Sequence, residues 1–549
     1  MAVRATTIER VAREAFGYEA LRPGQLEAIE AVVGGRDTLA VMSTGSGKSA
    51  IYQIAGLLIE GATVVVSPLI ALQRDQVDAL QERQRSRTGT ARDFGAAQLN
   101  STVGRAEREE ALAELAEDAL EFLFLAPEQL ANQDVLDELA VAQPSLLVVD
   151  EAHCISEWGH DFRPDYLRLG AAAEALGRPT ILALTATAAP PVRGEIVERL
   201  GLRDPALIVR NFDRPNIHLA VERFYEEHHH RRALLDAVAA APPPGIVYTA
   251  TRKDAEALAE ELAERGVRAA AYHGGLRAKL RDEVQEGFMH GRVDCVVATT
   301  AFGMGVDKAD VRWVFHAAPA DSLDSFYQEL GRAGRDGEPA SSVLFYRPEH
   351  LGLRRFFAGS GQVDADVLER VAIVVEAADG PVEPTDLQEE TDLSQSKLTT
   401  AVSRLEDAGA IEVLPSGEVA EAPGAPDREE AVAEALEIED HRRTFDRSRV
   451  EMMRGYAETT ECRRTVLLAY FGEPYEPPCG NCDNCDKGLA EAPPAEVPFP
   501  VGARVRHASW GEGVIQRYED DAIAVLFDDI GYKTLALAVV VERGLLTAV

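Results

Sequence analysis

The sequence predicts an α/β architecture built on two parallel β-sheets. From about residue 38 to residue 346, short apolar runs rich in β-branched residues alternate with Ala-, Leu- and Glu-rich stretches. Continuously apolar strands separated by helices are typical of parallel sheets covered on both faces. The span is too long for one sheet, so we predict two, joined near NFDRPNIH (211–218). The predicted strands are TLAVM, TVVVSP, EFLFLAP, LLVVDEA and TILALTAT in the first sheet, then GIVYTAT, DCVVATTAF, WVFHAAP and SSVLFY in the second.

After the second sheet the pattern changes. Residues 351–425 predict a winged-helix-like domain of three helices and a two-stranded turn at PSG. Residues 426–488 are helical and end in a cysteine cluster, and a Pro/Ala/Glu-rich linker follows at 489–500. Short alternating strands with Gly-rich turns indicate a small β-barrel at 501–549. The two sheet domains themselves are expected at 1–210 and 211–350.

The chain of 549 residues carries 92 Asp and Glu against 56 Lys and Arg, a net charge of −36. This balance argues against a general polyanion-binding surface, although a locally basic cleft can coexist with it. Acidity is strong in 361–430, where 18 acidic residues stand against four basic ones, enough to repel phosphates unless the bases cluster. No run approaches the roughly 20 apolar residues needed to cross a bilayer, and the first 16 residues predict an amphipathic helix. We therefore expect a cytoplasmic protein without a membrane partner.

A phosphate-binding loop is predicted at MSTGSGKS (42–49), between the strand TLAVM and a helical stretch. Glycines let backbone N–H groups wrap phosphates, Lys48 reaches the terminal phosphates, and the Ser49 hydroxyl ligates Mg²⁺. Met42 replaces the first glycine of the general pattern, and the alternative is a plain Gly-rich turn. The predicted nucleotide-binding residues of this loop are Thr44, Gly45, Ser46, Gly47, Lys48 and Ser49.

Two carboxylates end the strand in VVDEAH, about 100 residues later. We expect Asp150 to hold Mg²⁺ and Glu151 to orient and deprotonate the attacking water. The alternative, two solvated acids at a strand end, loses ground because the phosphate loop is present as well. In QELGRAGRDG (328–337), Arg332 and Arg335 are candidates to stabilise charge on the γ-phosphate, although two spaced arginines alone are usually a solvated helix face. Together these features predict a nucleoside triphosphatase.

Four of the six cysteines, Cys462, Cys479, Cys482 and Cys485, have the spacing C-x16-C-x2-C-x2-C. Such a set suits tetrahedral Zn²⁺ bound by four thiolates, and a closed shell of this kind is structural. The alternative is a redox dithiol. Cys154 and Cys295 are expected to be small buried residues, and the histidine run 228–230 a solvated helix start.

These motifs, in this order, resemble those of superfamily 2 helicases and in particular the RecQ DNA helicase family, over roughly residues 8–350. FGYEALRPGQ (16–25) resembles the segment that recognises adenine, SPLIALQRDQV, LNST and APEQL resemble strand-contacting motifs, and TAT (185–187) resembles the motif that couples hydrolysis to DNA. AYHGGL and ATTAFGMGVDK match motifs of the second sheet, and ECRRTVLLAYFGE with CGNCDNC resembles the family's zinc platform. The resemblance implies two RecA-like lobes with ATP between them. It implies nucleotide contacts by Tyr18, Arg22, Gln25, Gly305 and Asp307, and DNA contacts by Asn100, Ser101, Thr102 and His273.

CISEWGHDFRPDY (154–166) resembles the family's aromatic-rich loop, which senses single-stranded DNA and signals to the ATP site. Trp158 and Phe162 offer stacking faces for unpaired bases, and Arg163 can meet a phosphate; His160 is included in the predicted DNA contacts. Glu157 stands where the family usually has Gln. The alternative is a packed aromatic loop that stabilises the sheet edge.

Two features depart from the family. The winged-helix-like segment comes before the zinc-binding segment, whereas most relatives have the opposite order, and its acidity weakens its expected grip on duplex DNA. The C-terminal stretch 501–549 resembles the Tudor-like module of UvrD-type helicases, which implies contact with RNA polymerase or another protein. The alternative is a small barrel that packs on the core or touches DNA.

The resemblance predicts an ATP-dependent 3′-to-5′ DNA helicase that uses ATP, Mg²⁺ and Zn²⁺ on single-stranded and tailed or branched DNA in repair or recombination. One alternative is a DNA-stimulated translocase or annealing factor that remodels protein–DNA complexes with little unwinding. The other is a non-enzymatic adaptor that binds DNA or RNA polymerase.

Overall fold

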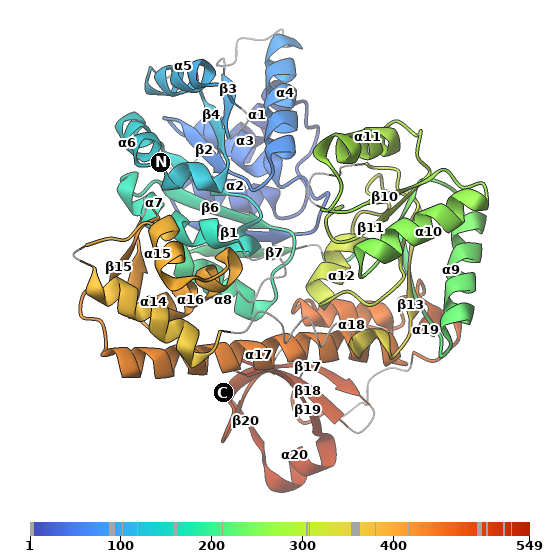
Figure 1. Cartoon of the computed structure of the whole chain (residues 1–549). Coiled ribbons are helices and arrows are strands. Elements are labelled where there is room, and N and C mark those ends of the chain that lie inside the picture. The colour runs from blue at the N-terminus through green and yellow to red at the C-terminus, as the bar shows by residue number, and fades with distance from the viewer. Residues whose placement is uncertain are drawn as a thin grey trace. The chain divides into compact units, whose positions relative to one another are not determined.

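The chain divides into two compact units, one made of Met1–Asn211 with Gly361–Arg442 and the other of Phe212–Ser360 with Arg443–Val549. The protein is represented by a computed structural model (Figure 1). It describes residues 5–86, 94–100, 103–117, 119–156, 163–210, 212–303, 306, 308–352, 363–378, 380–414, 417–490, 497–500, 503–519, 522–528 and 530–549.

The first unit holds a seven-stranded, all-parallel sheet with the strand order β3-β4-β2-β5-β6-β1-β7. Its strands are β1 (Thr38–Met42), β2 (Thr63–Val66), β3 (Ala96–Leu99), β4 (Phe122–Leu125), β5 (Leu146–Val149), β6 (Thr180–Thr185) and β7 (Ala206–Arg210). The central strands β1, β2, β4 and β5 are buried along their whole length, as their continuous apolar runs predict. Strands β5, β6 and β1 are neighbours, so the loops that follow their carboxyl ends meet at one edge of the sheet.

Helices alternate with these strands. They are α1 (Ala5–Phe16), α2 (Gln25–Val33), α3 (Ser49–Leu58), α4 (Ile70–Ser86), α5 (Arg105–Ala116), α6 (Gln133–Ala142), α7 (Leu169–Ala175) and α8 (Pro190–Arg199), with 3₁₀ helices η1 (Pro127–Ala131), η2 (Ala152–Ile155) and η3 (Pro164–Arg168). The amphipathic helix predicted at the N-terminus is α1, whose Ile8, Ala12, Ala15 and Phe16 join the core.

The second unit holds a six-stranded parallel sheet in the order β10-β11-β9-β12-β13-β8. The strands are β8 (Ile217–Arg223), β9 (Gly245–Tyr248), β10 (Ala269–Tyr272), β11 (Cys295–Ala298), β12 (Trp313–His316) and β13 (Ala340–Tyr346), and the helices are α9 (Glu227–Ala240), α10 (Arg252–Glu264), α11 (Ala278–Met289) and α12 (Leu323–Leu330). The prediction of two parallel sheets is confirmed.

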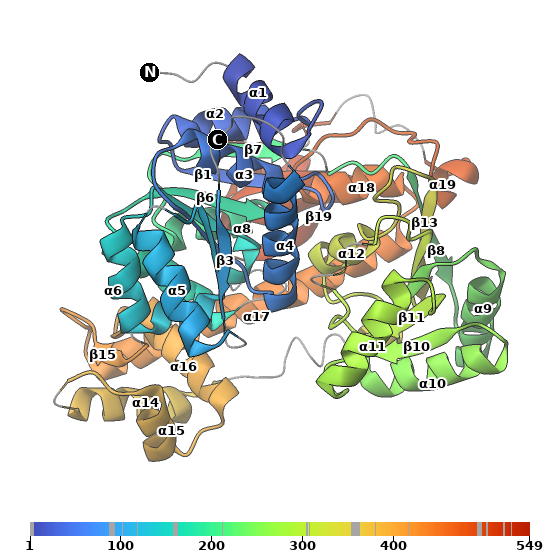
Figure 2. The same cartoon turned by 90° about the horizontal axis from the view of Figure 1, so that it is seen from above.

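The winged-helix-like segment belongs to the first unit, beside the first sheet in both views (Figures 1 and 2). It contains α14 (Ala365–Ala377), α15 (Pro384–Thr391), α16 (Gln395–Asp407) and the antiparallel pair β14 (Ile411–Val413) and β15 (Val419–Glu421). Its apolar core is completed by Ala431 and Ala435 of α17 (Arg428–Glu458).

The rest of the second unit consists of the last part of α17, α18 (Arg463–Tyr470), α19 (Asp483–Asp486) and a C-terminal antiparallel sheet in the order β19-β18-β17-β16-β20. That sheet comprises β16 (Arg504–His507), β17 (Gly511–Glu519), β18 (Ala522–Phe527), β19 (Gly531–Ala536) and β20 (Leu546–Ala548), with α20 (Leu537–Arg543) before its last strand. Val497 and Phe499, assigned to the linker by the sequence, pack against its core. Tyr532 of β19 stacks on Tyr470 at 5.4 Å between ring centroids, which attaches the sheet to α18.

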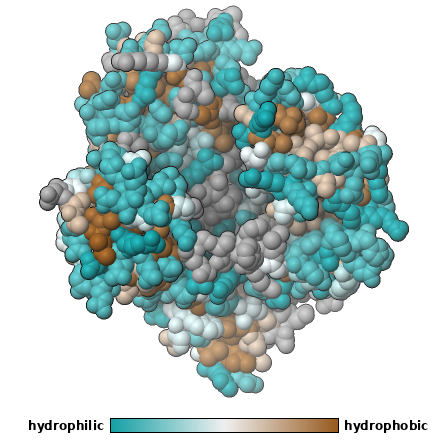
Figure 3. All heavy atoms as spheres, viewed as in Figure 1, coloured by the Kyte–Doolittle hydropathy of each residue, from teal (hydrophilic) through white to brown (hydrophobic). Residues whose placement is uncertain are grey.

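The face of the molecule seen in Figure 3 is mostly hydrophilic, in keeping with the acidic composition. Among the described residues, none of the helices has the length and apolar character that a membrane span requires.

Candidate nucleotide and DNA site

The predicted phosphate loop lies between β1 and α3. Gly45 (φ 80°) and Gly47 (φ 78°) adopt the left-handed conformation that favours glycine. Lys48 precedes the first turn of α3, and its Nζ donates to the carbonyl oxygen of Met42 at 3.1 Å. The hydroxyl of Ser46 is buried and makes no hydrogen bond among the described residues. A turn of this kind at a helix N-terminus presents backbone N–H groups to phosphate, so the loop fits a nucleotide.

The segment predicted to recognise adenine is bonded to this loop. Gln25 Nε2 donates to the carbonyl oxygens of Ser46 (3.0 Å) and Gly47 (2.9 Å), and Arg22 Nη1 donates to that of Gly45. The Tyr18 hydroxyl donates to Gln53 Oε1 at 3.2 Å. An open groove of 620 Å³ is lined partly by Tyr18 and Arg22. The structure therefore brings together the phosphate loop and the three residues predicted to read the base.

The two catalytic carboxylates follow β5. Burial and the neighbouring charge of Glu151 raise the pKa of Asp150 to about 7, while the charge of Lys48 acts in the opposite direction. Glu151 has φ 49°, and its backbone N–H donates to Asp150 Oδ1 at 3.0 Å. A part-buried carboxylate whose negative charge is only partly compensated fits a divalent cation, because the cation would offset the cost of removing the charge from water.

This cost leads to a pH-dependent prediction for Asp150→Asn. Between about pH 4 and pH 7 the folded protein holds a proton on Asp150 that the unfolded chain has released, so the free energy of unfolding falls as the pH rises through this range. The variant lacks this loss. In nucleotide-free protein at pH 8 it is expected to be more stable than wild type by on the order of 1–4 kcal/mol, with a smaller gain at pH 5.

Thermal melting at both pH values measures this difference. Asp137→Asn, at an exposed position on α6, is the matched control and should show no such pH dependence. A destabilised Asp150→Asn protein, or a gain equal at both pH values, would contradict the proposed cost of burying Asp150.

The catalytic strand end is also bonded to the motif TAT and to η3. His153 Nδ1 lies 2.9 Å from Thr185 Oγ1, the first residue of TAT. The Tyr166 hydroxyl donates to the carbonyl oxygen of Asp150 at 2.9 Å. Burial raises the pKa of Tyr166 well above its ordinary value, so the phenol remains a donor. These bonds link β5, β6 and the last residue of the predicted DNA-sensing loop.

Several predicted site residues lie outside the described part of the chain: Trp158, His160, Phe162, Ser101, Thr102, Gly305 and Asp307. Arg163 is described, and its Nη1 donates to the carbonyl oxygen of Pro68 at 3.2 Å. Asn100 is 5% exposed and donates to Gln73 Oε1 at 3.0 Å.

In the second unit, Arg332 and Arg335 follow α12. Arg332 is buried, and its Nε makes no hydrogen bond among the described residues. Arg335 Nη1 donates to the carbonyl oxygen of Val306 at 3.0 Å. His273, a predicted DNA contact, is only 3% exposed and lies 3.1 Å from Glu256 Oε1, so its ring faces this carboxylate and not open solvent.

The four predicted zinc ligands come together. The sulfurs of Cys462, Cys479, Cys482 and Cys485 all lie within 4.8 Å of one another. The Sγ atoms of Cys479 and Cys485 are 3.8 Å apart, close to the roughly 3.8 Å edge of a tetrahedron with Zn–S bonds of about 2.3 Å. Hydrogen bonding between Cys462 and Cys482 lowers the pKa of Cys462 to about 3 and raises the pKa of Cys482, so one thiol of this pair ionises readily. The donor set and its spacing fit structural Zn²⁺.

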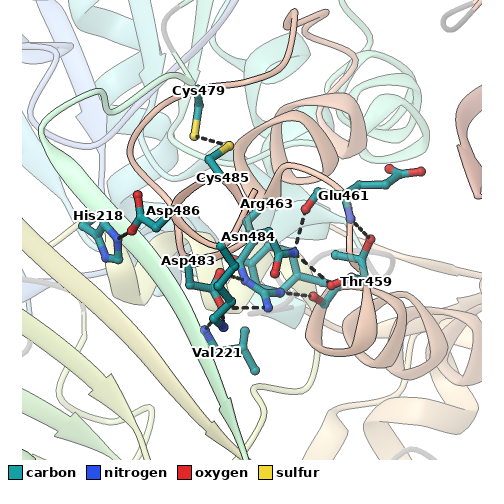
Figure 4. Close-up of polar contacts among 12 residues, drawn as sticks. His218, Val221, Thr459, Glu461, Arg463, Cys479, Asp483, Asn484, Cys485 and Asp486 are labelled. Atoms are coloured by element: carbon teal, nitrogen blue, oxygen red, sulfur yellow. Dashed lines mark hydrogen bonds and ion pairs between the residues drawn. The ribbon is translucent and has the colours of Figure 1, made fainter. Parts of the chain in front are cut away.

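The cysteine cluster is tied to the edge strand β8 of the second sheet (Figure 4). Arg463 and Asp483 form a buried ion pair, and Asp483 Oδ2 accepts from the Val221 N–H at 3.3 Å. His218 Nε2 lies 2.9 Å from Asp486 Oδ2. Asn484 Nδ2 donates to the carbonyl oxygens of Thr459 (2.9 Å) and Glu461 (2.7 Å). Residues that neighbour the four cysteines in the sequence therefore form a polar joint between α18, α19 and β8.

Sequence reasoning missed residues that have no motif of their own. Ser156 Oγ donates to Glu195 Oε2 on α8 at 2.5 Å, a contact 39 residues apart that no local pattern signals. His230 was expected at a solvated helix start, yet it is 3% exposed and groups with Glu227 and His350. His230 is the third residue of the run and falls on the inner face of α9, as the periodicity of the helix explains.

Three family models match the chain. Residues 22–194 match the DEAD/DEAH box helicase family, residues 230–337 the helicase conserved C-terminal domain, and residues 428–486 the RecQ zinc-binding domain. The first covers β1 to β6 of the first sheet, the second covers β9 to β12 of the second sheet, and the third covers the cysteine cluster with the long helix before it.

Curated relatives match most of the chain. Probable ATP-dependent DNA helicase RecS of Bacillus subtilis is 36% identical over 490 residues, which cover 88% of this chain and 93% of RecS. ATP-dependent DNA helicase RecQ of Haemophilus influenzae is 35% identical over 475 residues, 86% of this chain but only 63% of that protein.

Among solved structures, helicase Lhr of Mycobacterium smegmatis bound to ssDNA and AMP-PNP has a TM-score of 0.51 at 21% identity, covering 79% of this chain and 61% of Lhr. This likeness shows the fold. The three matched domains and the relatives at 35–36% identity show more: the chain belongs to the RecQ family of superfamily 2 helicases.

Proposed function

We propose that this protein is an ATP-dependent DNA helicase of RecQ type, which unwinds tailed or branched DNA in the 3′-to-5′ direction during repair or recombination in the cytoplasm. The observation that supports it best is the hydrogen bond from the Tyr166 hydroxyl to the Asp150 carbonyl. It connects the stretch predicted to sense single-stranded DNA with the carboxylates predicted to hydrolyse ATP. The relatives named as ATP-dependent DNA helicases support the same reading.

Hydrolysis is assigned to residues of three loops. The phosphate loop wraps the phosphates, and Lys48 moves from the Met42 carbonyl to neutralise them. Ser49 and Asp150 would hold Mg²⁺, which would offset the negative charge of the phosphates when bound. Glu151 orients the attacking water and accepts its proton. Arg332 and Arg335 are proposed to stabilise charge on the γ-phosphate, and the unpaired Arg332 Nε supports this role.

DNA binding is assigned to the aromatic-rich loop with Arg163 and to the LNST motif with Asn100. Trp158 and Phe162 would stack on unpaired bases, which suits a helicase because stacking is tolerant of sequence. The described contacts of this region support the assignment, since Arg163 donates to the carbonyl of Pro68 within the motif SPLIALQRDQV. Zn²⁺ would have a structural role and no catalytic one, because four cysteine thiolates would complete its tetrahedral shell.

Trp158→Ala tests the coupling. Wild type should hydrolyse ATP faster when single-stranded DNA is added. In Trp158→Ala the basal rate should stay within about twofold of wild type. The DNA-stimulated rate should fall by about tenfold or more, in the range that the loss of a stacking interaction of about 1–3 kcal/mol allows. Steady-state hydrolysis over a titration of oligo(dT) measures both rates. Trp313→Phe is a control for changing a tryptophan elsewhere, in β12. Equal stimulation in Trp158→Ala and wild type would remove the aromatic-rich loop from the account.

A DNA-stimulated translocase with little unwinding is a second candidate, favoured by the charge of the winged-helix-like segment. Three of the four basic side chains of 361–430 are bonded within the protein: Arg370 Nη1 donates to the Thr391 carbonyl, Arg404 pairs with Glu439, and Arg428 pairs with Glu376. Arg404 is buried, and the exposed Arg370 and Arg428 are outnumbered by acidic residues, so this stretch repels a duplex and is poorly suited to grip DNA during strand separation.

We further propose that the C-terminal sheet contacts a protein, with RNA polymerase as the candidate partner that the resemblance implies. Val539 and Val541 on α20 are 37% and 61% exposed, and exposed apolar residues on one short helix support a protein contact. Co-sedimentation of the full chain with purified RNA polymerase tests this, and Val541→Glu should weaken any complex formed.

A further inference from the structure

Within the first unit, the winged-helix-like segment is linked to both ends of the predicted DNA-sensing stretch (154–166), through η2 at one end and η3 at the other. Helix η2 ends at Ile155 and η3 begins at Pro164, and both lie close to Asp150. Helix η2 follows the catalytic carboxylates directly along the chain, and Tyr166 of η3 bonds to the Asp150 carbonyl. Anything that holds η2 and η3 therefore also holds the catalytic strand end.

The first contact is a chain of charges that begins at the end of η2. Ser156 is fully buried, and its hydroxyl donates to Glu195 Oε2 at 2.5 Å. The other oxygen of this carboxylate lies 3.6 Å from Arg199 Nε, one turn further along α8. Arg199 then forms an ion pair with Asp407, the last residue of α16 in the winged-helix-like segment.

Asp407 also has an ion-pair partner within its own helix, α16. Arg404 Nη1 lies 3.6 Å from Asp407 Oδ2, and Arg404 is only 1% exposed. Its Nε donates to Glu439 Oε2 of α17 at 2.8 Å. With both its neighbours fixed, the Asp407 carboxylate loses little side-chain entropy when it pairs with Arg199, which makes this pair stronger than a mobile surface pair.

The second contact joins η3 to the turn between β14 and β15. Gly417 has φ 95°, and a Cβ added there would lie 2.7 Å from Arg168 Nη1, so the guanidinium of Arg168 packs directly on this turn. A groove of 340 Å³ runs beside it, lined by Leu167 of η3 and by Leu387 and Leu398 of the segment.

Among the described residues, the winged-helix-like segment does not share an apolar core with η2, η3 or α8. The apolar core of the winged-helix-like segment is formed by residues of 363–438, and no residue of η2, η3 or α8 belongs to it. The groove also shows that the junction is not closely packed. Polar contacts, and above all Arg199–Asp407, therefore account for the docking, and such contacts make or break at modest cost.

We propose that Arg199 and Asp407 are positioning residues for DNA-stimulated ATP hydrolysis: by docking the winged-helix-like segment on α8 and η3, they hold η2 and η3, and with them Asp150 and Glu151, in the arrangement that DNA binding completes. The inference rests on the proposed function for its effect on hydrolysis. It assigns the acidic segment a role inside the protein in place of a grip on duplex DNA.

The test uses the full chain and the variants Asp407→Asn and Arg199→Gln, which remove charge with little change in size. Each should lower the kcat of hydrolysis at saturating oligo(dT) by at least about fivefold, the lower end of usual coupling between sites. The basal kcat and the oligo(dT) concentration for half-maximal stimulation should stay within about twofold. The double variant should lose no more than the worse single variant, because both remove the same ion pair.

Arg203→Ala is the matched control. Arg203 lies shortly after the end of α8 and pairs with Glu174 of α7, and no described contact joins this pair to η2. Hydrogen exchange of peptides covering Asp150–Ser156 and Arg163–Leu169 gives a readout that does not require activity, and exchange there should rise in Asp407→Asn and Arg199→Gln alone. Faster exchange in the two variants, together with wild-type hydrolysis that DNA does not stimulate, would contradict the proposed function but support the docking contact. Unchanged exchange and stimulation in both variants, or an equal loss in Arg203→Ala, would overturn the inference.

Discussion

Replacement of Glu151 by Gln is expected to reduce ATP hydrolysis at saturating single-stranded DNA by about 10²–10⁴-fold, the usual contribution of a general base. The amide keeps the size of the side chain but cannot accept the proton of the attacking water. Nucleotide affinity should change little, because the phosphate loop and the Gln25 contacts that fix it are untouched. Steady-state hydrolysis and direct nucleotide binding, measured on the same preparations, separate the two effects.

Glu138→Gln provides the control for this change, since Glu138 is exposed on α6 and belongs to none of the predicted motifs. It should hydrolyse ATP at the wild-type rate. A Glu151→Gln protein that keeps more than a tenth of the wild-type rate would show that another group takes the proton, and would require a new assignment of the catalytic base.

The second large effect is expected at the zinc site. Cys482→Ser should release the metal and lower the free energy of unfolding of the second unit by on the order of 3 kcal/mol or more, because ligand geometry and fold are coupled in a structural site. The polar joint on β8 depends on the same residues, since Asp483 and Asp486 lie beside the ligands and pair with Arg463 and His218. A shift in melting temperature of roughly 6–12 °C would follow.

Metal content and thermal melting of the purified variant measure this effect. Cys295→Ala removes a buried cysteine of β11 that is not part of the cluster, and should retain one zinc per chain. A Cys482→Ser protein with full zinc content, or with an unchanged melting temperature after zinc loss, would contradict a structural role for the cluster.

The central strands and the motifs that follow them were predictable, because β1, β2, β4 and β5 are buried along their whole length and so have continuously apolar sequences. The strands β3, β7, β8 and β10 were not predicted. They are the edge strands of the two sheets, and each contains partly exposed or exposed side chains. Edge strands are less buried than central ones, so their sequences differ less clearly from those of loops and helices.

The candidate site was predictable where chemistry requires particular residue types at fixed spacing. The phosphate loop, the carboxylates after β5 and the four cysteines meet that condition, and the structure gathers the cysteines as predicted. The connection from Ser156 through Glu195 and Arg199 to Asp407 does not meet it. Its residues are common polar types, one contact of the connection joins residues 208 positions apart, and only the folded chain brings them together.

We propose that ATP hydrolysis by this protein separates DNA strands. The most direct measurement is ATP-dependent unwinding of a duplex with a 3′ single-stranded tail, compared with 5′-tailed and blunt duplexes and with hydrolysis followed in the same reaction. We expect the 3′-tailed duplex to be unwound, the other two to remain paired, and Glu151→Gln to be inactive on all three. Hydrolysis stimulated by single strands without separation of any duplex would contradict the helicase assignment and favour the translocase.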